Sequence, residues 1–244
     1  MPIDLDYFRA VQGATGLDNI QNVVAEETKA RLKRDFLTSV NCEYHSQRNG
    51  VEQKFIVTST DRVSLMDIIA FPDEPLEIGD LIDCYGEKWI VTAKYAINTF
   101  QWKGKMQQCN HLLRFQNGTP DILERWIWFD SGVYSTTEHQ VPVGAVPDQQ
   151  FKIYVQFDED TRKIFVGKRL AIERWTDAKQ KPILLCYRVT APDSVSKSYG
   201  NGKLLMLKCR SDQYDPKSDN LDEMICDFVA PGLVVPPSAD EKWW

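Results

Sequence analysis

The sequence contains few of the residues on which catalytic centres depend, and it contains no long hydrophobic run. Only 3 of its 244 residues are histidines, and no G-x-S-x-G motif accompanies them, so no hydrolase triad is predicted. No apolar run approaches the roughly 18 residues of a membrane span. Residues 1–6 are acidic and lack an apolar region. We therefore expect neither a membrane segment nor a secretory signal.

Glycine-rich phosphate loops are also missing from the sequence. Residues 199–203 come closest, but they lack the P-loop spacing and precede an expected strand, so we interpret them as a turn. Residues 166–169 fail for the same reason. Together with the scarcity of histidine, this absence predicts a protein that is not an enzyme and needs no cofactor.

Cysteine is present but is not arranged as a disulfide framework or a metal site. The 6 cysteines are scattered, without a C-x-x-C pair, which favours buried thiols in a reducing cytoplasm. Cys42 with His45, and Cys109 with His111, have spacings that zinc tolerates, but structural zinc sites use tighter ligand pairs. The acidic stretch 211–220 does not match a calcium loop. We interpret the cysteines and histidines as ordinary strand residues and the stretch 211–220 as a solvated loop. We therefore predict no metal site.

What the sequence does contain is the composition of a soluble globular protein. Hydrophobic residues make up 43% of the chain and charged residues 26%. The formal net charge is -6, which argues against a general nucleic-acid-binding protein, because such proteins carry basic surface. The length allows one large domain or two small ones.

The first 40 residues are predicted to form a helical arm. Asp18 is a candidate N-cap, and the segment from there to Phe36 contains neither proline nor glycine. Glu27 and Arg31 have the favourable i, i+4 spacing. The apolar stripe is only approximate, so we expect this helix to lean on a neighbour rather than on a core of its own.

The rest of the chain is predicted to be β. Asn49-Gly50 lies between two alternating runs and predicts a hairpin turn, since both positions tolerate positive φ. Short strands at this spacing indicate a small barrel or sandwich. A second series of alternating runs begins at Phe151 and includes candidate strands at 163–166 and 224–228.

The predicted fold is mainly β, with an N-terminal helix, a small β-barrel or sandwich domain and a second antiparallel β domain. Its five expected parts are the helical arm (1–40), the β-barrel domain (41–118), a connecting segment with a long loop (119–150), the second β domain (151–229) and an extended tail (230–244).

Aromatic side chains in or beside expected loops indicate interaction surfaces rather than catalysis. Residues 99–105 are predicted to form a loop with aromatic rings and positive charge, and such a hairpin tip can insert into a neighbouring subunit. The tryptophan pair that follows the proline-rich tail is expected to dock onto a partner. The candidate interface residues are Phe100, Trp102, Lys103, Lys105, Trp243 and Trp244.

Two blocks of the sequence resemble neck, or head–tail connector, proteins of siphovirus-type phages and prophages. The first block contains the runs EIGDLI at 77–82, KWIVT at 88–92 and CNHLLRFQ at 109–116. The second contains IYVQFDEDT at 153–161 and GKRL at 167–170. The resemblance covers roughly residues 40–228 and rests on strand and turn patterns.

The resemblance implies a head-closure, or stopper, protein of the virion, made in the host bacterial cytoplasm. Such a protein forms a six- or twelve-fold ring that joins the portal or adaptor to tail proteins and retains the packaged DNA. Stoppers are similar in having a small β-barrel with a long loop into the channel. The implied partners are copies of the chain itself, portal and adaptor proteins, tail or tail-terminator proteins and the passing genome, but no membrane.

Other interpretations stay open at this point. The chain is compatible with another virion role, such as tail completion, baseplate or capsid decoration. A different class is a β-sandwich hydrolase that uses Trp126 and Trp128 as sugar platforms. A third is a soluble ligand-binding module.

Overall fold

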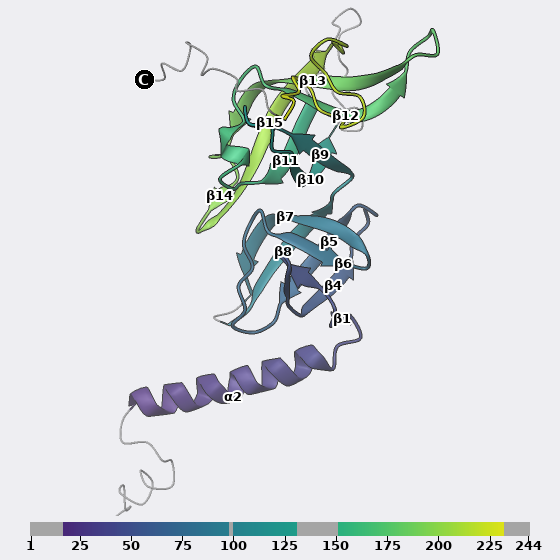
Figure 1. Cartoon of the computed structure of the whole chain (residues 1–244). Coiled ribbons are helices and arrows are strands. Elements are labelled where there is room, and N and C mark those ends of the chain that lie inside the picture. Colours follow the sequence, from purple (N-terminus) through teal and green to yellow (C-terminus); the bar gives the residue numbers. More distant parts are fainter. Residues whose placement is uncertain (1–16, 98–99, 131–150, 232–244) are drawn as a thin grey trace, which may run out of the picture.

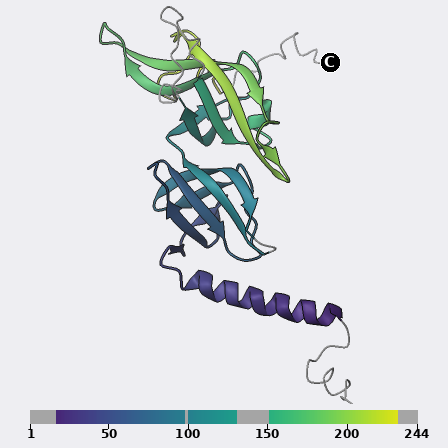
Figure 2. The same ribbon diagram turned by 180° about the vertical axis from the view of Figure 1, so that it is seen from behind.

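The computed structural model describes residues 17–97, 100–130 and 151–231. Part of the expected connecting loop (131–150), most of the expected tail and the candidate interface residues Trp243 and Trp244 lie outside these described residues. The described chain is mainly β and contains one helix, so the predicted fold class is confirmed. Figures 1 and 2 show three tiers, which are the helix, a first sheet and a second sheet.

Helix α2 (Leu17–Leu37) lies across the outer end of the first sheet (Figure 1). It begins at Leu17, so Asp18 lies within the helix rather than at its cap. From residue 24 to the end of the helix, every side chain that is not exposed lies on one face; these are Ala25, Lys29, Leu32, Lys33 and Phe36. Among the described residues, no helix combines the length and the apolar character that crossing a membrane requires.

The first sheet has eight antiparallel strands and forms a half-barrel, which we call barrel A. Its strands are β1 (Cys42–Glu43), β2 (Gln47–Arg48), β3 (Val51–Glu52), β4 (Phe55–Ser59), β5 (Leu65–Ala70), β6 (Leu81–Cys84), β7 (Glu87–Ala96) and β8 (Trp102–Gln108). They pair in the order β1-β4-β5-β8-β7-β6-β2-β3. Alternate residues face the core, as Phe55 and Val57 do on β4 and Ile68 and Ala70 on β5.

The Asn49-Gly50 hairpin is confirmed between β2 and β3. Arg48 pairs with Val51, and Asn49 and Gly50 have φ values of 50° and 82°. Both central residues therefore have the positive φ that a two-residue hairpin loop of this kind requires.

The second sheet closes into a barrel, which we call barrel B. Its strands are β9 (His111–Phe115), β10 (Leu123–Asp130), β11 (Phe151–Gln156), β12 (Arg169–Thr176), β13 (Pro182–Asp193), β14 (Ser198–Tyr199) and β15 (Gly202–Asp212). They follow the order β11-β10-β9-β12-β13-β15-β14, and an additional β11–β15 pairing closes six of them. The barrel is filled by inward residues such as Ile127, Ile153, Leu170 and Leu207.

Strand pairing divides the chain differently from the sequence-based division at 118 and 150. Strand β9 pairs with β10 and β12, so residues 111–115 belong to barrel B rather than to the first β domain. Residues 125–129 have the β-prone sequence of a strand, as predicted, but strand β10 belongs to barrel B rather than to a connecting segment. Alternation shows that a strand is half-buried but not which sheet it joins, and the pairing partners of β9 lie later in the chain.

Two candidate strands of the second half are not strands. Residues 161–163 form a short 3-10 helix, η1 (Thr161–Lys163), and a turn follows it. Residues 224–228 contain turns and a single bridge between Asn220 and Ile225. In both places buried side chains, such as Ile164 and Ile225, gave an apolar pattern without a partner strand.

The two barrels pack directly against each other. An apolar cluster between them takes residues from both sheets; its buried members are Ile78, Ile90, Cys109, Tyr154 and Leu204. Gly79 and Gly202 allow the backbones to meet here. A Cβ atom on Gly79 would lie 2.0 Å from the carbonyl oxygen of Lys203, and one on Gly202 would lie 2.5 Å from the backbone nitrogen of Ile78. The junction therefore depends on close backbone contact as well as on apolar burial.

Candidate functional site

The predicted interface loop is the tip of the β7–β8 hairpin, but most of its candidate residues lie on a strand. Strand β8 begins at Trp102, which pairs with Ala96 on β7. Three apolar side chains are exposed at this tip, namely Tyr95 (43%), Ile97 (47%) and Trp102 (36%). The ammonium of Lys94 lies 3.9 Å from the centre of the Trp102 ring. The tip is thus an exposed aromatic surface supported by a cation–π contact.

The two lysines predicted in this interface are engaged within barrel A. Lys103 and Lys105 form ion pairs with Asp67 on β5 at 2.8 and 3.1 Å. The hydrogen bond from Lys103 outweighs partial burial and holds the pKa of Asp67 below its usual range. These cations are therefore balanced by a carboxylate, and the sequence pattern alone overstated the positive charge of the tip.

The turn at residues 71–75 connects the tip to the helix. The carbonyl oxygen of Phe100 accepts a hydrogen bond from the backbone nitrogen of Asp73 at 2.9 Å. The Asp73 carboxylate lies 2.7 Å from the ammonium of Lys29 and 3.5 Å from that of Lys33. The bond from Lys29 holds the pKa of Asp73 below its ordinary value. Asp73 therefore contacts both the hairpin tip, through its backbone, and the helix, through its side chain.

Aromatic packing reinforces the same place. The ring of Phe36, near the end of α2, packs edge-on against Phe71 at 5.1 Å. We call the surface formed by α2, the 71–75 turn and the exposed tip residues the helix–tip face. Both ribbon views show the helix and the end of the β7–β8 hairpin at the same end of barrel A.

The tryptophans considered as sugar platforms pack at the junction between the barrels. Trp128 stacks on Tyr154 with ring centres 4.4 Å apart and planes 14° apart. Trp126 packs against the same apolar cluster. These contacts give both rings a structural role.

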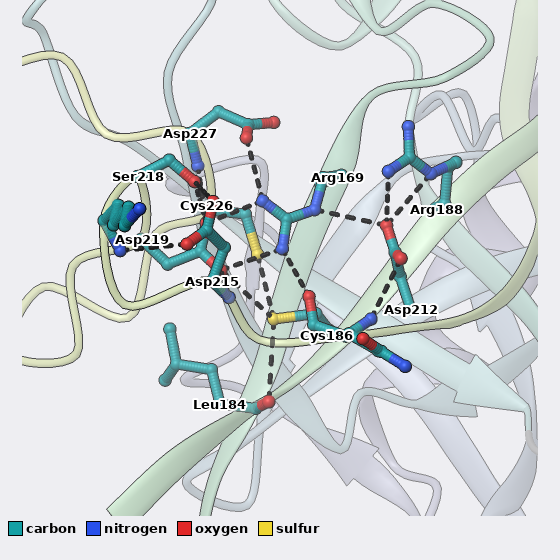
Figure 3. Close-up of polar contacts among 12 residues, drawn as sticks. Arg169, Leu184, Cys186, Arg188, Asp212, Asp215, Ser218, Asp219, Cys226 and Asp227 are labelled. Atoms are coloured by element: carbon teal, nitrogen blue, oxygen red, sulfur yellow. Dashed lines mark hydrogen bonds and ion pairs between the residues drawn. The ribbon is translucent and has the colours of Figure 1, made fainter.

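The second candidate site is a buried cluster around Arg169, the first residue of β12 (Figure 3). Only 8% of Arg169 is exposed. Its guanidinium donates to both oxygens of Asp219, at 2.7 and 2.8 Å, and to Asp227 at 2.9 Å and Asp212 at 3.2 Å. Asp212 also accepts from Arg188 at 2.9 Å. Arginine's planar fork suits such bidentate contacts.

The charges in this cluster stabilise one another despite their burial. Burial by itself would raise the pKa of Asp219, but the Arg169 bonds and two backbone donors hold it below its usual value. Burial would likewise lower the pKa of Arg169, and its bonds to Asp219 and Asp227 raise it instead. The interpretation of 211–220 as a solvated loop is therefore wrong for Asp219, whose side chain is fully buried.

The cluster fastens a segment without regular strands, residues 213–231, which we call the strap. Outside the Arg169 contacts, Arg114 donates to the carbonyl oxygen of Glu223 at 2.8 Å. The Gln116 amide donates to the carbonyl oxygen of Val229 at 3.0 Å and accepts from its backbone nitrogen at 2.8 Å. Polar contacts along its length therefore hold the strap on barrel B.

Two thiols meet beneath the strap. The sulfur atoms of Cys186 on β13 and Cys226 in the strap lie 3.2 Å apart, and Asp219 approaches Cys186 at 3.9 Å. Among the described residues, these three form the group of potential metal ligands that the structure brings within 4.8 Å of one another. The Cys42–His45 and Cys109–His111 combinations weighed from the sequence are not part of such a group.

The sequence reasoning missed both Arg169 and its partners. GKRL at 167–170 was read only as a turn and strand pattern, and the acidic residues only as solvated. A single arginine at the start of a strand gives no signal, because its partners lie 43 to 58 residues later in the chain.

Comparison with known proteins adds no identification. No family model, no curated protein and no solved structure matches this chain.

Proposed function

We propose that the protein is a structural component of the phage neck, a ring-forming head-closure or stopper protein that joins the portal or adaptor to tail proteins and retains DNA. The observation that carries this proposal is the helix–tip face, which presents an exposed helix surface and exposed aromatic residues at one end of a β-barrel. The resemblance of the two sequence blocks to neck proteins agrees with it.

The helix is a candidate subunit contact because its own barrel covers only one of its faces. On the other face Val24, Glu27, Arg31 and Arg34 are exposed. Isolated helices are marginal in water and gain most of their stability from packing. A neighbouring copy in a ring would cover this second face and complete the packing.

The hairpin tip supplies the apolar part of the proposed contact. Tyr95, Ile97 and Trp102 are large side chains at the end of a long hairpin. Aromatic residues are enriched where interfaces concentrate their binding energy. In the proposed ring the tip inserts against the adjacent subunit, and the short two-residue edge strands β1 and β3 lie close to neighbouring copies.

In the proposed ring, barrel B would be the domain that faces outward. It is closed through β11 and β15 and carries its own strap, so it leaves few unpaired strand edges. The net charge of -6 would permit DNA to pass without tight binding. The proposed location is the virion, after synthesis in the host bacterial cytoplasm.

Native mass spectrometry of the full chain, alone and mixed with portal rings of the same phage, tests the proposal. We expect a six- or twelve-fold species, or a complex with portal. The double variant Tyr95→Ala/Trp102→Ala should weaken that assembly at least tenfold, because it truncates two exposed aromatic anchors. Its thermal melt should stay close to that of the parent chain.

The matched control is Trp175→Ala, which removes an equally large side chain that is 57% exposed on β12 of barrel B. This variant should assemble like the parent. A stable monomer that ignores portal would contradict the neck role and favour decoration or baseplate. Equal loss of assembly in both variants would contradict the assignment of the interface to the tip.

A further inference from the structure

Cys186 and Cys226 lie close enough for their two thiols to form a disulfide bond. Both residues are only 2% exposed, and their sulfur atoms lie 3.2 Å apart. Ordinary nonbonded contacts between carbon atoms lie at roughly 3.5–4.0 Å, and sulfur is larger than carbon. A disulfide bond of about 2.05 Å would therefore require an approach of only about 1 Å.

Backbone contacts fix the position of each cysteine. Asn220 and Ile225 exchange backbone hydrogen bonds at 2.8 and 3.1 Å immediately before Cys226. The backbone nitrogen of Asp227, immediately after it, donates to Asp219 at 3.1 Å. Cys186 lies in the middle of β13, which pairs on both sides. Both cysteines therefore lie in backbone that is held by hydrogen bonds, which keeps their sulfur atoms close together.

A metal ion fits this group poorly. Both oxygens of Asp219 already accept from Arg169, and the backbone nitrogens of Asp215 and Asp227 donate to them as well. A cation here would have to displace these donors and would lie close to a buried guanidinium of the same charge sign. Only two thiols would then remain as unoccupied ligands, whereas structural zinc takes four.

We propose that Cys186 and Cys226 are a redox-switchable pair whose disulfide locks the strap onto barrel B. The oxidant is a low-molecular-weight disulfide such as oxidised glutathione. One cysteine thiolate attacks it and releases one glutathione thiolate, and the second cysteine then displaces the other glutathione. In total, the two cysteine thiols lose two protons and two electrons, and one glutathione disulfide becomes two thiols. The bond would form whether or not the chain assembles into a ring.

The local chemistry makes this exchange slow in the folded protein. The hydrogen bond to Cys186 and burial raise the pKa of Cys226 well above that of an ordinary thiol. Exchange requires a thiolate and access for the reagent, so brief opening of the strap should set its rate. The disulfide would in turn close a loop between residues 40 positions apart and oppose that opening.

The test uses the full chain with oxidised glutathione at about pH 8.5, where ordinary thiols are partly ionised. A parallel sample contains urea below the unfolding midpoint, so that the strap opens and access does not limit the result. We expect a chain lighter by two hydrogen atoms, with one cross-linked peptide that contains Cys186 and Cys226. The melting temperature should rise by roughly 5–10 °C and return to its starting value with dithiothreitol.

Two single variants separate this pair from the other buried thiols. Cys226→Ala should abolish both the cross-link and the temperature shift. Cys209→Ala, which removes a buried thiol on β15, should keep both. If Cys226→Ala fails to fold, the peptide map of the oxidised parent chain by itself shows whether Cys186 and Cys226 are cross-linked. Glutathione adducts without a cross-link in urea, or a cross-link to another cysteine, would overturn the proposal. So would stoichiometric zinc binding that protects both thiols.

Discussion

The two barrels deal with the edges of their sheets in different ways. Barrel B pairs β11 with β15 over residues 151–156 and closes its sheet, so six of its strands have two neighbours. Barrel A remains a half-barrel that ends in the two-residue strands β1 and β3. Closure removes the exposed edges on which strands of other chains can pair. In the ring that we propose, barrel A would therefore be the side that meets neighbouring subunits, because barrel B already pairs its own edges.

Each barrel also contains an arginine–aspartate pair with a different structural task. In barrel A, Asp80 accepts from Arg48 and Asn49 at 2.5 and 2.8 Å and orders neighbouring turns. In barrel B, Asp219 joins Arg169 to a strap that has no strand ladder of its own. A buried pair that fastens a segment without a strand ladder should be more costly to break than one beside a paired sheet.

The largest expected effect comes from breaking that attachment. Asp219→Asn should lower the free energy of unfolding by about 3–5 kcal/mol, because it leaves the buried Arg169 without its bidentate partner. Urea unfolding measures the loss. The matched control is Asp215→Asn on the same strap, whose carboxylate contacts are exposed, and which should cost less than about 1 kcal/mol. Equal losses in both variants would contradict the central role of Asp219.

A smaller effect is expected from separating the barrels. Gly79→Ala should cost about 2–4 kcal/mol, because Gly79 has φ of +89° and its new Cβ would meet the Lys203 carbonyl oxygen. Hydrogen exchange should show barrels that open independently in this variant and together in the parent. Gly86→Ala is the control, since Gly86 has φ of +74° but no atom within 4 Å of the added carbon. If Gly86→Ala costs as much, backbone strain rather than barrel contact explains the loss.

The smallest expected effect is a difference in acid sensitivity between the barrels. The folded pKa values of Asp219 and Asp212 lie below their unfolded values, so their stabilisation is present above about pH 4 and is lost as the pH falls toward the folded values. Between about pH 4 and 2 we expect a loss of about 1–2 kcal/mol in barrel B. Hydrogen exchange at each pH measures it for the two barrels separately. The pKa of Asp67 in barrel A shifts in the same direction, but its side chain is 22% exposed whereas that of Asp219 is fully buried, so barrel A should lose less. A greater acid loss in barrel A would reverse the comparison.

Features that depend on adjacent residues were predictable. The Asn49-Gly50 turn follows from the φ preferences of its two residues, and the strands of barrel A follow from alternation. The helix follows from a run without proline or glycine, although Asp18 lies inside it rather than at its cap. The β7–β8 hairpin was expected, but the boundary between tip and strand was not, so Trp102 was placed in a loop.

Features that depend on distant residues were not predictable. Asp219 lies in a polar stretch with Pro216 and Lys217, and its burial depends on an arginine 50 residues earlier. The contact of Cys186 with Cys226 likewise joins residues 40 positions apart. Local patterns carry no information about such pairs, because many acidic residues and several thiols have similar surroundings in the sequence.

The sequence by itself determined that the chain is mainly β, that a helix precedes the strands and that its turns fall at residues such as Gly50. These properties follow from backbone preferences and from the period of apolar residues, which act over a few positions. Tertiary structure alone decided which sheet β9 joins, that barrel B closes and that Arg169 binds aspartates of the strap. The reason is that pairing and burial depend on the positions of residues that are far apart along the chain.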